Sequence, residues 1–133
     1  MYVQRVNELR AKGAYSLAVQ DGSTIYLAGQ LPIDLETGAL CLGTAKEEAA
    51  LILNNIEQIL SFYGVDRNRI LKTTVFMTDP SYWGEINEAY NEFFTQVRPV
   101  RSAVVVGQIP TMGFKVEIEV IATTNPIDMT VVD

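Results

Sequence analysis

Three charged side chains lie in two segments of the sequence that are typical of β-strands. Arg101 lies in the run 99–106, which is rich in branched apolar residues, and Glu117 and Glu119 lie in the strictly alternating run 116–122. A guanidinium in a partly buried strand cannot lose its charge, so it needs a carboxylate or a bound anion as its partner. One cation and two acids, expected on neighbouring strands, therefore form the best candidate for a functional site.

The same three residues allow more than one interpretation. Arg101 could bind an anionic ligand, or it could form a structural ion pair with Glu117 or Glu119. Either acid could be the reactive one, because residues two apart on a strand point to the same face of the sheet. The residues alone leave these alternatives open.

The composition excludes several kinds of chemistry. The sequence of 133 residues contains no histidine and a single cysteine, Cys41. Catalytic groups built on histidine are therefore impossible, and the usual zinc sites lack their ligands. Any general base must be Asp, Glu, Lys, Tyr or a water molecule that backbone groups orient. Because the lone cysteine cannot form a disulfide within the chain, we expect a reducing cytoplasm as the location.

Charge and hydropathy narrow the range of partners. The formal net charge is −6, whereas nucleic-acid binders are normally basic, so DNA or RNA is not expected as the main partner. No apolar run approaches the roughly 20 residues that cross a bilayer, and the start of the sequence lacks the apolar core of a signal peptide. The length fits one globular domain.

The spacing of apolar and turn residues predicts the element order β, β, α, β, α, β, β. A capping box from Thr44 to Glu47 starts the first helix, and Gly64 supplies the left-handed position after its end. The second helix starts at Asp79-Pro80 and continues to Val97 before Pro99 ends it. The predicted strands are residues 15–20, 24–28 and 70–78, followed by two that start at Arg101 and Lys115.

Each predicted helix connects strands that can lie parallel through a right-handed crossover. Two crossovers of the same hand place both helices on one face of the sheet. The opposite face is then too apolar to suit water alone, since it is expected to carry Thr74, Phe76, Ala103, Val105 and Glu117. Covering that face requires a partner, most simply another copy of the chain.

Several segments of the sequence resemble the RidA family, which is also called YjgF/YER057c/UK114. The matched segments span about residues 13–122 and are 13–19, 28–34, 72–76, 86–90, 99–102 and 116–119. The resemblance implies an α+β fold of the chorismate-mutase-like, YjgF type, in which a mixed sheet carries two helices on one face. It also implies a homotrimer with three sites in the clefts between subunits.

The resemblance implies hydrolysis of reactive 2-imino acids, the tautomers of enamines, to 2-oxo acids and ammonia, without a cofactor or metal. Arg101 matches the family arginine that grips the substrate carboxylate, which a planar guanidinium can bind through two parallel hydrogen bonds. Glu117 matches the acid that holds or activates the hydrolytic water. Tyr15 and Asn87 match residues that line the substrate pocket.

Two of the matched substrate-binding positions depart from the family pattern. Ala103 stands where many members have a cysteine, and Ala28 stands where many have a serine, so two polar groups are lost. The departures motivate an alternative function, a protein of the same fold that binds a small carboxylate without turnover. A third possibility is an endoribonuclease, a label that some members carry, but the acidic charge disfavours it.

The resemblance also divides the chain into a core and two variable ends. Residues 1–133 are expected to form a single RidA-like domain, in which residues 1–12 are a variable leader and residues 123–133 are a C-terminal tail.

Overall fold

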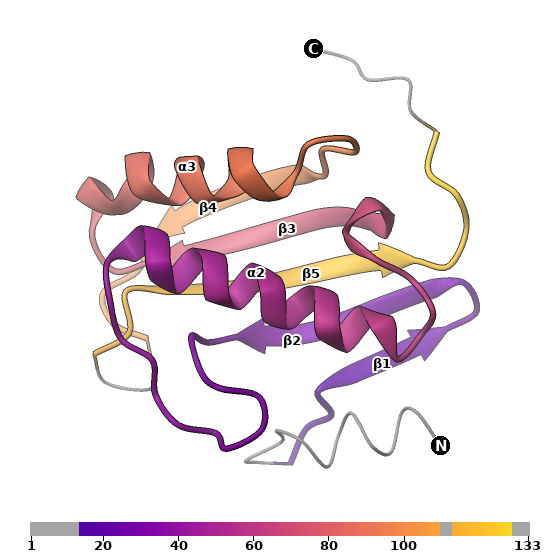
Figure 1. Cartoon of the computed structure of the whole chain (residues 1–133), viewed down its shortest axis with the longest axis horizontal. Coiled ribbons are helices and arrows are strands. Elements are labelled where there is room, and N and C mark those ends of the chain that lie inside the picture. Colours follow the sequence, from indigo (N-terminus) through magenta and orange to yellow (C-terminus); the bar gives the residue numbers. More distant parts are fainter. Residues whose placement is uncertain (1–13, 110–112, 129–133) are drawn as a thin grey trace.

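The computed structural model describes residues 14–109 and 113–128. The predicted leader, residues 1–12, and the end of the predicted tail, residues 129–133, lie outside the described residues. One mixed five-stranded sheet carries two helices on the same face (Figure 1), as predicted. The strands are β1 (Ala18–Asp21), β2 (Thr24–Gln30), β3 (Ile70–Met77), β4 (Val100–Val105) and β5 (Val116–Thr123), and the helices are α2 (Ala45–Ser61) and α3 (Trp83–Phe93).

The strand order is β1-β2-β5-β3-β4, so the strand that comes last in the sequence lies in the middle of the sheet. β3 and β4 are parallel, and the other neighbouring pairs are antiparallel. The expectation that the strands of Arg101 and Glu117 are neighbours is therefore wrong, because β3 lies between them. A crossover helix has to place β4 parallel to β3, and the space beside β3 on the other side is taken by β5.

The N-terminus of α2 forms as the sequence predicts. The Thr44 side chain accepts a hydrogen bond from the Glu47 backbone, and the Glu47 side chain accepts one from the Thr44 backbone. These two bonds satisfy amides that have no partner within the helix. The buried stripe of α2 packs on the sheet, and Gly64, at φ 75°, reverses the chain after the helix.

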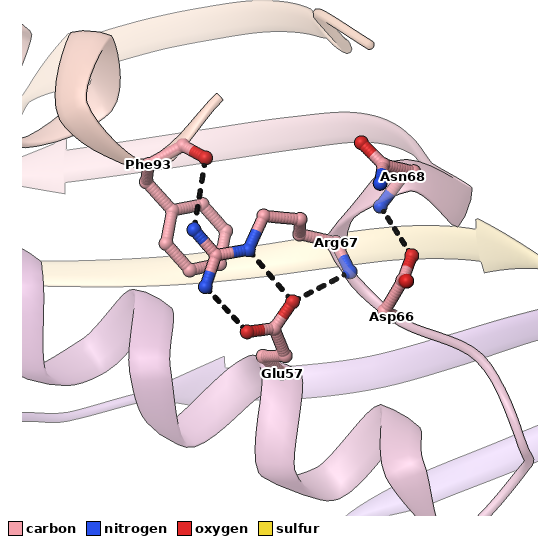
Figure 2. Close-up of polar contacts among 5 residues, drawn as sticks. All are labelled: Glu57, Asp66, Arg67, Asn68 and Phe93. Atoms are coloured by element: carbon pink, nitrogen blue, oxygen red, sulfur yellow. Dashed lines mark hydrogen bonds and ion pairs between the residues drawn. The ribbon is translucent and has the colours of Figure 1, made fainter. Parts of the chain in front are cut away.

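The second helix ends earlier than predicted. A short 3-10 turn, η2 (Pro80–Tyr82), precedes α3, and α3 ends at Phe93 rather than near Val97. The Phe93 carbonyl accepts a hydrogen bond from Arg67 Nη1 at 3.1 Å, and the Arg67 guanidinium lies 3.9 Å from the Phe93 ring centre (Figure 2). Because Arg67 satisfies this carbonyl, the helix can stop here.

Arg67 is itself held by a carboxylate of α2. Its Nε and backbone amide both donate to Glu57 Oε2, at 2.7 Å and 2.9 Å, and Nη2 donates to Oε1 (Figure 2). The Arg67 charge lowers the pKa of Glu57 below its ordinary value, because hydrogen bonds from the guanidinium favour the ionised carboxylate. One residue of the 3-10 turn η1 (Arg67–Arg69) thus joins α2 to the end of α3.

The faces of the outer strand β4 differ from the prediction. Ala103 pairs with Val75 and Val105 pairs with Met77, and both partners are buried under the helices. Because paired residues point to the same face, Ala103 and Val105 lie on the helix side and not on the open side. The open face, defined here as the sheet face without helices, instead carries Ser102 and Val104 from β4, with Lys72, Thr74, Phe76, Glu117, Glu119, Ile121 and Tyr26.

A bulge explains a second difference in register. The alternation of β3 predicts Leu71 on the same face as Val75 and Met77, but Leu71 is exposed and Ile70 is fully buried. The pairing of β3 with β5 shifts between Ile70 and Lys72, so one extra residue is left out of the ladder.

A buried carboxylate joins the start of α2 to the start of β5. Glu48 is fully buried and accepts hydrogen bonds from the amides of Gly43 (3.2 Å) and Lys115 (2.8 Å). The ammonium group of Lys115 lies 3.5 Å from the same carboxylate. These partners supply the hydrogen bonds that a buried charge needs. Within the described part of the chain, the helices are too short or too polar to span a bilayer.

Candidate functional site

Arg101 lies on the helix side of the sheet, between two aromatic rings of α3. It pairs with Thr73, which is fully buried, and this register turns its side chain toward α3. The guanidinium carbon lies 4.9 Å from the ring centre of Trp83 and 4.9 Å from that of Tyr90. Cation–π contacts of this kind hold a guanidinium without neutralising its charge.

The guanidinium has no carboxylate partner among the described residues. The ion pairs found there involve Lys46, Arg67 and Lys115, and none involves Arg101. Glu117 and Glu119 face the other side of the sheet, since they pair with Phe76 and Thr74. The alternative of a structural ion pair between Arg101 and either acid therefore has no support in this geometry.

Arg101 opens into a pocket of about 260 Å³ between α3 and the start of β4. Apart from a proline, the lining side chains are aromatic or carry hydrogen-bond donors, and none of those from the described residues is a carboxylate. They belong to Asn87, Tyr90, Asn91, Phe94, Arg98, Pro99 and Arg101. A concave site with cationic and amide donors on an aromatic floor fits a small anion. The predicted site residues Asn87 and Arg101 thus lie in one pocket.

Tyr90 lines this pocket, and a buried hydrogen bond holds its side chain in place. Its hydroxyl donates a hydrogen bond of 3.0 Å to Thr73 Oγ1, and both residues are buried. Burial raises the pKa of the Tyr90 hydroxyl to about 12, although the Thr73 hydrogen bond and the Arg101 charge oppose this shift. Tyr90 therefore stays neutral at physiological pH and acts here as a rigid wall.

Glu117 lies on the open face, directly over a glycine of β2. A Cβ added at Gly29 would overlap the Glu117 carboxylate, so only glycine leaves room for it. Burial raises the pKa of Glu117, and the like charge of Glu119 raises it further. A half-buried carboxylate with a raised pKa binds a proton more readily than an ordinary carboxylate, so it is suited to exchange protons with a bound water.

The six predicted site residues do not lie together within one chain. Arg101, Asn87 and Ala103 lie on the helix side, where Ala103 packs against the core. Glu117 lies on the open face. Tyr15, which is exposed, precedes β1, and the carbonyl of Leu17, two residues later, accepts a hydrogen bond from the Ala28 amide at 2.9 Å. One chain therefore does not bring Arg101 and Glu117 to a common ligand.

The sequence did not single out several residues around Arg101 as site residues: Trp83, which lies against its guanidinium, and Tyr90, Asn91, Phe94 and Arg98, which line the pocket. Trp83 could have been suspected because it is the only tryptophan, and it is half-exposed beside Arg101. Arg98 precedes Pro99, and its position beside Arg101 depends on how the chain turns after α3, which no sequence pattern specifies. Among residues 14–109 and 113–128, no cluster of Cys, Asp or Glu side chains is placed to hold a metal ion.

The fold and the pocket define a small α+β protein with an arginine-lined cavity of a size for a small organic anion. The family model described as endoribonuclease L-PSP matches residues 5–124. The chain belongs to this family, which is the RidA or YjgF family that the sequence motifs indicated.

Relatives with curated names and solved structures agree with this assignment. A mouse protein named 2-iminobutanoate/2-iminopropanoate deaminase is 42% identical over 116 residues, which are 87% of this chain and 85% of the mouse protein. The human protein of the same name is 38% identical over 117 residues, which are 88% of this chain and 85% of the human protein.

The crystal structure of RidA from a Psychrobacter species is 36% identical, with a TM-score of 0.83 and coverage of 92% of this chain and 98% of that one. The structure of E. coli TdcF with bound serine is also 36% identical, with a TM-score of 0.80 and coverage of 86% of this chain and 91% of that one.

Proposed function

We propose that this protein hydrolyses reactive 2-imino acids to 2-oxo acids and ammonia. Water adds to the imine carbon, the carbon–nitrogen bond of the resulting carbinolamine breaks, and the nitrogen leaves as ammonia with the protons that water and the solvent supply. The observation that carries the proposal concerns residues 14–109 and 113–128: there, Arg101 has no carboxylate partner and lines a small pocket with no acidic side chain. The activity is also that for which the mouse and human relatives are named.

Arg101 binds the substrate carboxylate in this proposal. Two rings contact its guanidinium, and among the described residues no carboxylate pairs with it, so it can donate a pair of hydrogen bonds to a substrate carboxylate. Asn87 lines the same pocket and offers an amide to the imine or the oxo group. Ala103, two residues after Arg101 on the same face, leaves this wall apolar.

Glu117 positions the attacking water and accepts its proton. Its raised pKa makes it a stronger base than an ordinary carboxylate, which favours accepting a proton from the water and returning it later. Because Glu117 and Arg101 face opposite sides of the sheet, the Glu117 that serves one Arg101 has to come from a second copy of the chain. Tyr15 and Ala28, near the same end of β2, would line the cleft from the side of Glu117.

A homotrimer satisfies this requirement with three equivalent clefts. Each copy contributes its Arg101 to one cleft and its Glu117 to the next, which is a head-to-tail contact that closes by rotation. The contact also covers the open face, where Tyr26 and Val104 are exposed. The bound serine of E. coli TdcF is a small amino acid, and a ligand of this size fits the proposed cleft.

The test is ammonia release from imines that a coupled amino-acid dehydratase generates. We expect Arg101→Ala to abolish the acceleration over spontaneous hydrolysis and Lys46→Gln, a surface change of equal charge, to preserve it. Unchanged activity of Arg101→Ala would refute the proposal. Binding of 2-oxobutanoate without any acceleration in the unaltered protein would select the alternative, a carboxylate-binding protein without turnover.

Mixed assemblies test whether the site is shared between copies. Arg101→Ala and Glu117→Gln are each expected to be inactive alone, but refolding them together would create some clefts that carry both native residues. For random mixing in equal amounts, about a quarter of the clefts are intact and activity should return to that fraction. No recovery from a mixture that assembles normally would contradict the shared cleft.

A further inference from the structure

A second arginine lines the pocket of Arg101. Arg98 lies on the segment between α3 and β4, is exposed, and contributes to the pocket together with Arg101 and the amides of Asn87 and Asn91. Pro99 follows it directly and restricts the backbone at both positions. The described residues therefore contribute two guanidinium groups and two side-chain amides to the pocket, and no acidic group.

This concentration of positive charge is unusual for an acidic chain. Among the described residues, three cations pair with carboxylates, and Arg69 donates to a backbone carbonyl. The cations without an ion pair or hydrogen bond there are Lys72, Arg98 and Arg101. Two of these three line one pocket, although the sequence carries 16 acidic residues and 10 basic ones. Like charges in one cavity repel each other, so a ligand with two negative charges would relieve the repulsion.

We propose that this pocket binds a small dicarboxylate, so that the preferred substrate is a 2-imino acid whose side chain ends in a second carboxylate. This inference rests on the proposed function, in which Arg101 binds the carboxylate next to the imine. Arg98 binds the second carboxylate, and the volume of about 260 Å³ accommodates both groups. Asn87 and Asn91 donate to the oxygens that the guanidinium groups leave free, and the rings of Tyr90 and Phe94 contact the carbon chain.

The experiment compares two stable 2-oxo acids with the same length of carbon chain. 2-Oxoglutarate carries the second carboxylate, and 2-oxopentanoate ends in a methyl group. Trp83 is the only tryptophan and lies against Arg101, so its fluorescence reports binding without any turnover. The titrations use the full chain with no substitution and its variants Arg98→Gln, Arg98→Lys, Arg101→Gln and Lys46→Gln, all at one ionic strength.

We expect the unaltered chain to bind 2-oxoglutarate at least about tenfold more tightly than 2-oxopentanoate, which is what a charge-assisted hydrogen bond contributes. Arg98→Gln should remove this preference and leave the affinity for 2-oxopentanoate within about twofold, because that acid has no second carboxylate for Arg98 to bind. Arg98→Lys should keep part of the preference, since it keeps the charge but loses the planar fork. Lys46→Gln controls for the change in net charge and should bind as the unaltered chain does.

Equal affinity of the unaltered chain for the two acids would overturn the inference. It would also be overturned if Arg98→Gln weakened both acids by the same factor, because Arg98 would then act on the whole pocket. Neither result would affect the proposed function, because that proposal depends on Arg101 and not on Arg98. Normal binding of both acids by Arg101→Gln would refute the proposed function and this inference with it.

Discussion

Removing the Tyr90 hydroxyl should destabilise the fold without disabling the pocket above it. The hydroxyl donates to Thr73 Oγ1 at 3.0 Å in a buried environment, and Thr73 is fully buried. Tyr90→Phe deletes this hydrogen bond and leaves the Thr73 hydroxyl without that donor. A lost hydrogen bond together with a buried group left unpaired lowers the free energy of unfolding by ~1–2 kcal/mol.

The matched change on the other side of the bond completes a double-mutant cycle. Thr73→Val should cost a similar ~1–2 kcal/mol, because it leaves the Tyr90 hydroxyl buried without an acceptor. The double variant has an apolar group on each side, so it should cost much less than the sum of the single changes, with a coupling of about 1 kcal/mol. Urea unfolding at one protein concentration measures all four free energies, and additive costs would refute the reasoning.

Two further readouts separate the hydroxyl from the ring. The ring that flanks Arg101 remains in Tyr90→Phe, so binding of 2-oxobutanoate should stay within about twofold. Burial raises the pKa of Tyr90 from 10.0 to about 12, so the unfolded chain loses this proton at lower pH than the folded one. The unaltered protein should therefore lose stability as the pH rises from 10 to about 12, and Tyr90→Phe should lose less.

Three other perturbations test the remaining contacts. Gly29→Ala should displace the Glu117 carboxylate and so lower the rate of imine hydrolysis by about 100-fold. Binding of oxo acids should change little, and an unchanged rate would contradict the role of Glu117. Arg67→Ala should lower the free energy of unfolding by about 1–2 kcal/mol in urea. That difference should shrink as the pH falls below about 4, because the lowered pKa of Glu57 stabilises the fold only while this carboxylate is ionised. Glu119→Gln removes a like charge that raises the Glu117 pKa. The acid limb of the pH–rate profile should therefore move to lower pH, and a shift to higher pH would be inconsistent with that electrostatic effect.

Local signals predicted the elements well because each has a nearby physical cause. The reciprocal bonds of Thr44 and Glu47 start α2 as expected, and Gly64 has the positive φ that the turn after the helix requires. The alternating run 116–122 became β5, with Val116, Ile118 and Val120 buried and the two acids on the opposite face beside Ile121. These features depend on residues within a few positions of each other, so the sequence displays them directly.

The errors all involve contacts between distant segments. α3 stops at Phe93 because Arg67, which lies 26 residues earlier in η1, donates a hydrogen bond to the Phe93 carbonyl. The bulge at Leu71 depends on the match between β3 and β5. The largest error concerned the site itself, since whether Arg101 and Glu117 share a face depends on strand order and register. No short sequence pattern encodes strand order or register, because a shift of one residue moves every side chain of a strand to the opposite face of the sheet.

The central position of β5 affects the order in which the protein can fold during synthesis. A ribosome releases β1 and β2, and later β3 and β4, before the strand that has to lie between them. Until β5 emerges, β2 and β3 each present an unpaired edge, and the nascent chain can complete neither ladder. We therefore expect the domain to acquire protease resistance only when residues 116–123 have left the exit tunnel. Chains that stop before these residues should associate through the two unpaired edges.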